Sequence, residues 1–230
     1  MKGFVMKKIT ILIISILSIT ILAGCHKEIN QLAIPKAGDQ VAEIVVRDYG
    51  SIYIRFFEEE APKAVENFIT HAKEGYYDGQ VFYRIIKDSR LETGDPTGNG
   101  DGGESIWGEE FKDEFNPYLQ PYRGALCMSN LGPNTNKSQF FIVQAGSTFN
   151  EEVLEQIELN YDIKFNAKAR EIYGEKGGAP WYYKLNTVFG QVYEGYEVMD
   201  KIAAVEKKDE EHGIPAKDVV IETIKIFEYK

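Results

Sequence analysis

Short runs of β-branched and aromatic residues, separated by clusters of Gly, Pro and Asn, recur along most of the chain and limit the folds open to it. Residues 51–57 alternate with the two-residue period of a β-strand, and residues 47–50 join them to the preceding run as a hairpin. The predicted strands cover residues 41–46, 51–57, 81–86, 125–129, 139–144, 187–192 and 219–227. No unit of about 20 to 50 residues repeats, which excludes solenoids and propellers. The pattern predicts a mainly β protein, built as a barrel or a sandwich.

Two segments carry the spacing of amphipathic helices instead. In residues 62–75, which begin at Pro62, apolar residues recur at i, i+3, i+4 and i+7, and residues 196–205 show a similar face. Residues 147–180 are rich in Glu and Lys, with a helical pattern centred on 150–174. We expect this stretch to be a helical insertion between two strands, because about 25 residues are too few for a core of their own.

The first residues read as an export signal. Lysines precede an unbroken run of Ile, Leu, Ser and Thr over residues 9–22. As a helix this run would rise about 21 Å, short of the roughly 30 Å hydrocarbon core of a membrane. It ends in Leu22-Ala23-Gly24-Cys25, which resembles the bacterial lipobox. An ordinary secretory signal that happens to contain a cysteine is the alternative.

The lipobox predicts a lipoprotein. Residues 1–24 would be its signal peptide, Cys25 the lipid attachment site with diacylglyceryl and palmitate-type chains, and residues 25–40 a tether. One domain would then cover residues 41–230. The expected location is the outer, extracytoplasmic face of the cell membrane, where the lipid anchor on Cys25 would hold the protein.

The net charge argues against nucleic acid as a partner, and the cysteine content argues against an intrachain disulfide. Removal of residues 1–24 takes away three lysines and no acidic residue, so the net charge changes from −10 to −13. Such a chain repels phosphates, and nucleic acid is therefore not an expected partner. With Cys25 lipidated, Cys127 is left alone and no intrachain disulfide is possible. Cys127 lies in an apolar stretch and is predicted to be a small buried residue, not a nucleophile.

Three sequence patterns could suggest a cofactor or metal site, but the residues around each of them argue against such a site. Gly98, Gly100 and Gly103 match the spacing of a dinucleotide-binding loop, but no amphipathic helix follows them. Residues 97–108 partly imitate an EF-hand loop, yet the twelfth position is Gly108 instead of a bidentate Glu. The histidines are isolated from one another, which argues against zinc and against a Ser-His-Asp triad. We expect neither a metal nor a cofactor.

A set of motifs closely resembles the cyclophilin family of peptidyl-prolyl cis-trans isomerases over about residues 41–227. The motifs are Phe82-Tyr83-Arg84, Gly94-Asp95-Pro96, Gly-Pro-Asn-Thr-Asn-Lys-Ser-Gln-Phe-Phe-Ile at 132–142, and Val188-Phe189-Gly190. The resemblance implies a closed, antiparallel, eight-stranded barrel capped by two helices, with a peptide groove on one side. It also implies no cofactor and proline-containing polypeptides as partners, and the export signal implies that these polypeptides are exported.

Carried over position by position, the resemblance implies a catalytic role for Arg84. Phe141 would form the floor of a proline pocket, and Gln139 would brace both the substrate backbone and Arg84. The remaining substrate-binding residues implied are Ser129, Asn130 and Leu131 at the groove edge, Trp181, Tyr182 and Asn186 on the far side, and Glu92. A plainer interpretation of Trp181 and Tyr182 is aromatic packing against the insertion.

One segment departs from the family pattern. Where the family usually has Phe-Met-x-Gln-Gly, this chain has Ser89-Arg90-Leu91-Glu92-Thr93. Loss of one large apolar wall removes about 1.5 to 3 kcal/mol of burial. Glu92 is also expected to form an ion pair with Arg84, which would orient the guanidinium but weaken its donation to the prolyl nitrogen.

Two functions therefore stay open at this point. The first is an active, membrane-tethered isomerase that assists the folding of exported proteins. The second is a catalytically weakened cyclophilin-like module that binds proline-containing or extended segments. A sensor or scaffold role for the acidic loop and the insertion is a weaker third hypothesis.

Overall fold

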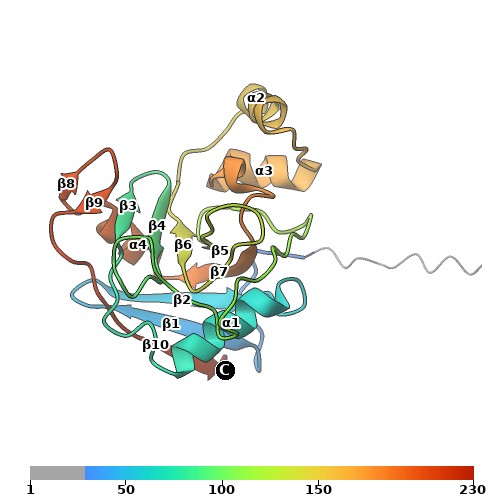
Figure 1. The fold of residues 1–230 in the computed structure, drawn as a ribbon. Helices are drawn as coiled ribbons and strands as arrows, with labels where there is room; N and C mark the ends of the chain where they lie inside the picture. The colour runs from blue at the N-terminus through green and yellow to red at the C-terminus, as the bar shows by residue number, and fades with distance from the viewer. Residues whose placement is uncertain (1–28) are drawn as a thin grey trace, which may run out of the picture.

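The structure, a computed structural model, describes residues 29–230 and has a strongly curved antiparallel sheet as its main element (Figure 1). The order of the eight strands in this sheet is β10-β1-β2-β7-β5-β6-β4-β3. Their bounds are β1 Gln40–Val46, β2 Gly50–Phe56, β3 Arg84–Ile86, β4 Arg90–Thr93, β5 Ala125–Met128, β6 Phe140–Val143, β7 Val188–Glu194 and β10 Ile221–Glu228. A second, two-stranded sheet pairs β8 (Lys207–Asp209) with β9 (Ile214–Pro215).

The expectation of a closed barrel is wrong, because the sheet is open between β3 and β10. These strands are the two edges, and no ladder joins them. The segment before β3 instead makes a short contact with residues 219–221: Val81 and Val220 form an isolated bridge, and the Phe82 N–H donates to the Val219 carbonyl at 2.9 Å. The Gly79 N–H donates to the Ile221 carbonyl, and the Ile221 N–H donates to the Gln80 carbonyl, both at 2.8 Å. The contact does not continue along β3, whose Ile85 N–H donates instead to the Gly213 carbonyl at 2.7 Å. The result is a curled half-barrel.

Two helices pack on the sheet as predicted. Helix α1 (Pro62–Lys73) begins with the proline that favours a first helical turn, and it lies against β10 and β7. Helix α4 (Tyr196–Ala203) buries Val198, Met199 and Ile202, and it starts after Gly195, whose φ of 94° suits glycine. The main core lies between these helices and the sheet.

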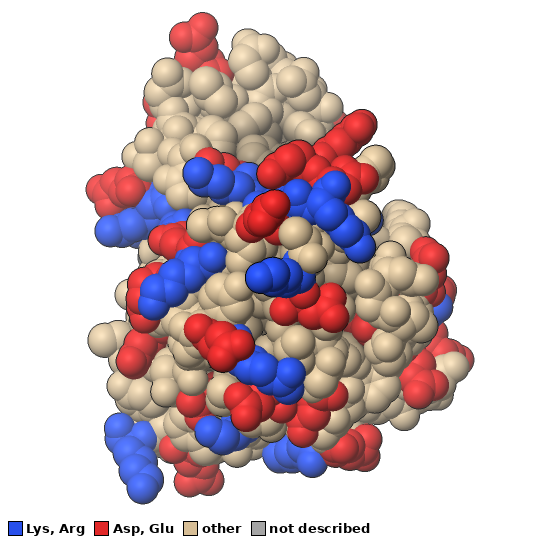
Figure 2. All heavy atoms as spheres, turned by 90° about the vertical axis from the view of Figure 1, so that its left-hand side faces the viewer, with Lys and Arg blue, Asp and Glu red and all other residues tan. Residues whose placement is uncertain are grey.

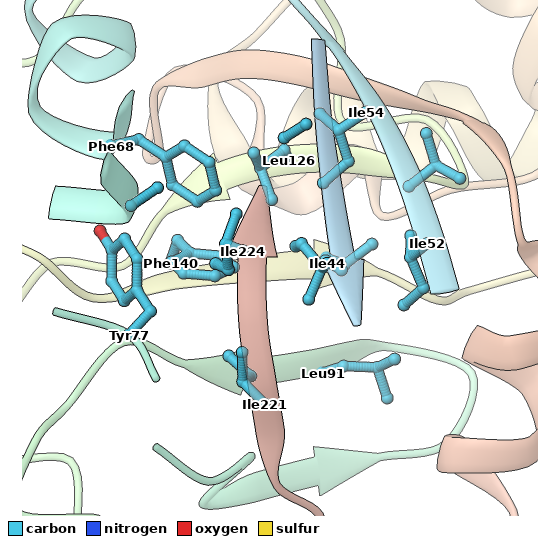
Figure 3. Close-up of a cluster of buried hydrophobic side chains, with 14 of the residues drawn as sticks. Ile44, Ile52, Ile54, Phe68, Tyr77, Leu91, Leu126, Phe140, Ile221 and Ile224 are labelled. Atoms are coloured by element: carbon cyan, nitrogen blue, oxygen red, sulfur yellow. The ribbon is translucent and has the colours of Figure 1, made fainter. Parts of the chain in front are cut away.

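Aromatic and branched side chains fill that core (Figure 3). Phe68 from α1 packs its ring 5.1 Å from the ring of Phe140 on β6 and 5.3 Å from that of Tyr77. Ile44, Ile52, Ile54, Leu91, Leu126, Ile221 and Ile224 complete the part of the core that Figure 3 labels. These residues come from the edge strand β10, from the central strands and from β4 next to the other edge, so one core spans most of the curved sheet.

The insertion contains two helices where the sequence pattern indicated one. Helices α2 (Glu151–Tyr161) and α3 (Ala167–Lys176) lie at the opposite end of the molecule from α1 and β10 (Figure 1). Asn150 and Asn166 cap them by accepting from the N–H groups of Val153 and Ala169. Their apolar cluster also takes in Tyr122 and Tyr183 from outside the helices, so the insertion shares its core with the domain.

The described part of the predicted tether packs on the domain. The Gln31 side chain, 2% exposed, donates to the Gln120 carbonyl at 2.7 Å and to Gln191 Oε1 at 3.0 Å. Arg55 donates to the carbonyl oxygens of Asn30 and Ala33, both at 3.0 Å. Hydrogen bonds to distant residues therefore hold Asn30, Gln31 and Ala33 of the predicted tether against the domain.

The predicted signal peptide and Cys25 fall on residues 1–28, which lie outside the described residues. Within residues 29–230, no helix has the length and apolar content needed to cross a membrane. On the face shown in Figure 2, Lys and Arg are interspersed with Asp and Glu. This face therefore does not concentrate one sign of charge.

Candidate active site

A cleft of about 480 Å³ collects most of the residues that the sequence singled out. It is bounded by β3, β4 and β6, by the segment after β5, and by the loop that leads into β7. The predicted residues that line it are Arg84, Glu92, Ser129, Asn130, Leu131, Gln139, Phe141, Tyr182 and Asn186. A larger hollow of about 660 Å³ between residues 29–40 and 55–60 contains none of them. The smaller cleft is the candidate site because the predicted catalytic and substrate-binding residues line it.

Strand register explains why these residues meet. Arg84 on β3 lies opposite Glu92 on β4, and Glu92 lies opposite Phe141 on β6. The next row, Ile85, Leu91 and Ile142, faces the core. Because successive side chains in a strand point to opposite faces, the core row fixes the other row toward the cleft. Local sequence thus aligns a cation, a carboxylate and an aromatic ring.

Glu92 is the centre of a charged network. Its side chain is 4% exposed, and Oε2 lies 3.1 Å from Arg84 Nη1 and 3.0 Å from Arg90 Nε. Oε1 accepts a hydrogen bond from the Ser129 hydroxyl. The expected ion pair with Arg84 is present, while Arg84 keeps 38% of its side chain exposed. One buried carboxylate therefore fixes two guanidinium groups.

Arg90 covers the expected floor of the proline pocket. Its guanidinium lies 5.5 Å from the centre of the Phe141 ring and 5.3 Å from that of Tyr182, and Nη1 donates to the Tyr182 hydroxyl at 2.7 Å. Ser89 Oγ lies 3.3 Å from the same hydroxyl. Phe141 is consequently only 1% exposed. Instead of an open apolar floor, the cleft presents a stack of cation and aromatic rings.

The opposite wall, which includes Asp101, is held by hydrogen bonds. Gln139 Nε2 donates to the carbonyl oxygens of Gly100 and Gly102 at 3.0 and 2.7 Å, and Oε1 accepts from the Tyr83 hydroxyl at 2.7 Å. In this arrangement Gln139 bonds to Tyr83, Gly100 and Gly102, while Glu92 pairs with Arg84.

Tyr83 is a site residue that sequence reasoning missed, although it stands next to Arg84 in the quoted motif. Burial, with the nearby charge of Glu92, raises the pKa of the Tyr83 hydroxyl. The hydroxyl therefore stays protonated and serves as a hydrogen-bond donor to Gln139.

The loop beside Gln139 is held in shape by hydrogen bonds to the Asp95 carboxylate, which belongs to the same loop. Asp95, 1% exposed, accepts from the N–H groups of Thr97 at 2.8 Å and Gly100 at 2.6 Å. Burial alone would raise the pKa of Asp95, but these hydrogen bonds outweigh it and hold the pKa below its ordinary value. Within residues 29–230, no group of three or more His, Cys, Asp or Glu is placed to hold a metal ion.

Asn130 and Asn186 tie the two sides of the groove edge together. Asn186 Nδ2 donates to the Met128 carbonyl at 3.0 Å, and Asn130 Nδ2 donates to the Leu185 carbonyl at 3.1 Å. Leu131 is 85% exposed at the same edge. These two hydrogen bonds therefore join the end of β5 and the segment after it to the loop before β7.

Trp181 does not line the cleft. Its ring lies 6.1 Å from Phe149 and 5.9 Å from Tyr182, so it packs between the insertion and the site, as the plainer interpretation predicted. Cys127 is fully buried, and burial raises the pKa of its thiol. This agrees with a packing role and not with a nucleophile.

The sequence of this chain matches one protein family and is similar to named proteins of that family. Residues 41–226 match the family model described as cyclophilin type peptidyl-prolyl cis-trans isomerase/CLD. A Staphylococcus epidermidis protein, provisionally named a peptidyl-prolyl cis-trans isomerase, is 44% identical over 190 residues, which are 83% of this chain and 93% of that protein. A similarly named Staphylococcus aureus protein is 43% identical over 203 residues, 88% of this chain and 96% of that protein.

Solved structures agree with these relatives. A crystal structure of a Cryptosporidium parvum cyclophilin type peptidyl-prolyl cis-trans isomerase matches with a TM-score of 0.66 and 28% identity, over 84% of this chain and 99% of that one. A second structure of that protein, in the presence of the dipeptide Ala-Pro, matches with a TM-score of 0.64 at the same 28% identity, over 82% and 99% of the two chains.

Proposed function

The chain belongs to the cyclophilin-type peptidyl-prolyl cis-trans isomerases, and from this premise we propose that it isomerises X-Pro bonds in exported polypeptides at the outer face of the cell membrane. The single observation that carries the proposal for the site is the position of Arg84. Its guanidinium is held by a buried carboxylate, remains partly exposed, and lines a cleft between aromatic rings and hydrogen-bonded amides.

Isomerisation needs no bond to break. Amide resonance sets a barrier of about 20 kcal/mol, and an X-Pro bond relaxes unaided in about tens to hundreds of seconds. As the bond twists, the lone pair of the prolyl nitrogen localises and becomes a hydrogen-bond acceptor. A guanidinium donor that is fixed before the twist begins stabilises this state without reorganising. Arg84 is suited to that donation because it is always charged and Glu92 holds one of its terminal nitrogens.

The remaining wall of the cleft would receive the polypeptide backbone. Gln139 is locked by Tyr83, Gly100 and Gly102, and the 129–131 edge is locked by Asn130 and the Ser129 hydroxyl bond to Glu92. Groups fixed in this way lose little conformational entropy when a segment binds. Ser129, Asn130 and Gln139 would orient the residues that flank the proline.

The location forms the second part of the proposal. It rests on the lipobox residues that end at Cys25 and on the export signal before them. Cells that express the full chain should yield it in the membrane fraction, accessible to protease added outside, and Cys25→Ala should release it. Recovery of the wild-type chain from the cytosol would contradict the proposed location.

A refolding assay tests the action on polypeptides. The slow phase of a proline-limited protein takes about 10 to 100 s at 25 °C. The full chain in detergent micelles should shorten this phase in proportion to its concentration. A rate that does not depend on the amount of added chain would refute action on whole polypeptides.

The position of Arg90 favours a second candidate, a binding module with little turnover. The Arg90 guanidinium bonds to Glu92 and Tyr182 and lies 5.5 Å from the centre of the Phe141 ring, so a proline ring bound on Phe141 would compete with it for the ring face. The variant Ser89→Phe/Arg90→Met/Glu92→Gln separates the two functions. A rate gain of about tenfold or more, equal to about 1.4 kcal/mol of barrier, would favour the binding module, whereas no gain favours the enzyme.

A further inference from the structure

Three exposed apolar side chains stand together on the cleft without any part in the network around Glu92. Leu131 is 85% exposed, Leu185 is 53% exposed and Phe115 is 47% exposed. All three line the same cleft as Arg84. We call these three residues the apolar rim. They come from three separate segments of the chain, yet they converge on one site, and a converging exposed apolar group is typical of a binding surface.

The apolar rim is held in place by polar contacts beneath its backbone. Asn130 Nδ2 donates to the Leu185 carbonyl at 3.1 Å and to Asp113 Oδ1 at 3.4 Å. Asp113, two residues before Phe115, also accepts from Asn136 Nδ2 at 2.8 Å. These bonds join all three segments of the rim. A surface that is rigid before binding gains more from burial, because little flexibility is lost.

The rim contrasts with the rest of the cleft wall. Gln139 has its amide occupied by protein groups, and Arg90 and Glu92 are bonded to each other. Among these cleft residues, the three of the rim keep a large exposed apolar surface. Their side chains have no polar group that needs a hydrogen-bond partner. Lys184 and Asp113 line the same cleft, but the surfaces of the three rim residues are apolar, so an apolar side chain of the substrate would gain most by covering them.

From these observations we propose that the apolar rim is a specificity site, which selects substrates with a large aliphatic or aromatic residue near the isomerised proline. The inference rests on the proposed isomerase function and adds the class of sequence that the enzyme prefers. An extended segment rises about 3.3 Å per residue, so the selected residue should lie within about three positions of the proline. Phe115, Leu131 and Leu185 would together contact this one side chain.

A peptide series tests the proposal on the full chain in detergent micelles. Each peptide has one proline in an alanine and serine background, with Leu, Ser or Asp placed in turn at each of the three positions on either side. At one position, Leu should raise kcat/KM about tenfold over Ser, chiefly through a lower KM. Leu131→Ser and Leu185→Ser should each reduce this ratio, and the triple variant with Phe115→Ser should bring it close to one.

Leu159→Ser supplies the matched control. Leu159 is 72% exposed on α2 and does not line the cleft, so its replacement makes the same chemical change elsewhere and should leave the Leu-to-Ser ratio unaltered. Circular dichroism and the melting temperature of each variant establish that it is folded.

The outcomes separate this inference from the proposed function. If wild-type chain accelerates no peptide, the isomerase function fails. If it accelerates Ser and Leu peptides equally at every position, or prefers Asp, the apolar rim does not select substrates. Retention of the Leu preference in the triple variant would equally overturn the inference.

Discussion

The cleft and the insertion each contain a buried glutamate whose carboxylate pairs with two cations, and the difference lies in what each carboxylate holds. In the insertion, Glu158 contacts Lys164 at 3.0 Å and Arg170 at 2.8 Å, and Oε1 accepts the Phe165 backbone N–H at 2.7 Å. In the cleft, Glu92 accepts only from side chains: Arg84, Arg90 and Ser129.

A buried glutamate paired with two cations thus serves two different purposes in this protein. Glu158 anchors backbone, and so it fixes the connection between α2 and α3. Glu92 anchors side chains, and so it positions two guanidinium groups that line a cleft. Loss of Glu158 should therefore affect stability, and loss of Glu92 should affect activity. Each of the following predictions tests one side of that contrast.

The largest of these effects is expected for Glu92→Ala. Arg84 and Arg90 lose their shared partner, and Arg84 is no longer held for donation. We expect kcat/KM for a proline peptide to fall about 100-fold, near the cost of losing one transition-state donor. Glu92→Gln keeps an acceptor oxygen and should stay within about fivefold of wild type, or about 1 kcal/mol. Equal activity of Glu92→Ala and wild type would show that Arg84 needs no anchor.

Glu158→Ala should lower stability and leave kcat/KM nearly unchanged. The Phe165 N–H and the Arg170 guanidinium lose their acceptor, at a cost of about 1 to 3 kcal/mol. For a chain of this size, each kcal/mol corresponds to about 2 to 4 °C in Tm. Lys164→Ala is the control, since Lys164 is 82% exposed and its pair should contribute about 0 to 1 kcal/mol. A Tm equal to wild type in Glu158→Ala would refute the anchoring role.

Arg90→Met should change activity little. The unbranched apolar side chain can lie on Phe141 as the guanidinium does, and Arg84 keeps its pair with Glu92. We expect kcat/KM within about threefold of wild type, a change below about 1 kcal/mol. A large gain would mean that Arg90 blocks the proline pocket.

The smallest effect is a pH dependence of stability. Burial alone would raise the pKa of Glu158, but the Phe165 N–H, Lys164 and Arg170 outweigh it and hold the pKa below its ordinary value of 4.5. The stabilisation is thus complete above pH 4.5 and is lost as the pH falls through the lowered pKa of the folded state. Unfolding of wild type and Glu158→Gln in urea should converge below that pH. A difference that is constant with pH would assign the stabilisation to packing.

The sequence predicted the framework well because periodicity decides which face of a strand is buried. The rows that contain Ile85, Leu91 and Ile142 set the register, and this register brings Arg84, Glu92 and Phe141 together. Strand β4 was missed, because the charged residues Arg90 and Glu92 gave it no apolar alternation, and helix α3 was missed because only Ala169 and Tyr173 are buried along it.

Other features depended on contacts that local sequence does not encode. The side chain of Gln31 bonds to residues about 90 and 160 positions away, and the local sequence of residues 25–40, which predicts a tether, carries no sign of these contacts. The open edge between β3 and β10 depends on how far two short segments can pair. The stack of Arg90 on Phe141 joins two strands through side-chain geometry.

The most direct test is the isomerisation rate of one proline peptide with the full chain and with Arg84→Ala. Both chains should fold alike, because Arg84 is partly exposed and lies on an edge strand. We predict that wild type exceeds the spontaneous rate in proportion to enzyme concentration and that Arg84→Ala reduces kcat/KM by about 100-fold to 1,000-fold. Equal rates for the two chains would contradict the assignment of catalysis to the guanidinium that Glu92 holds.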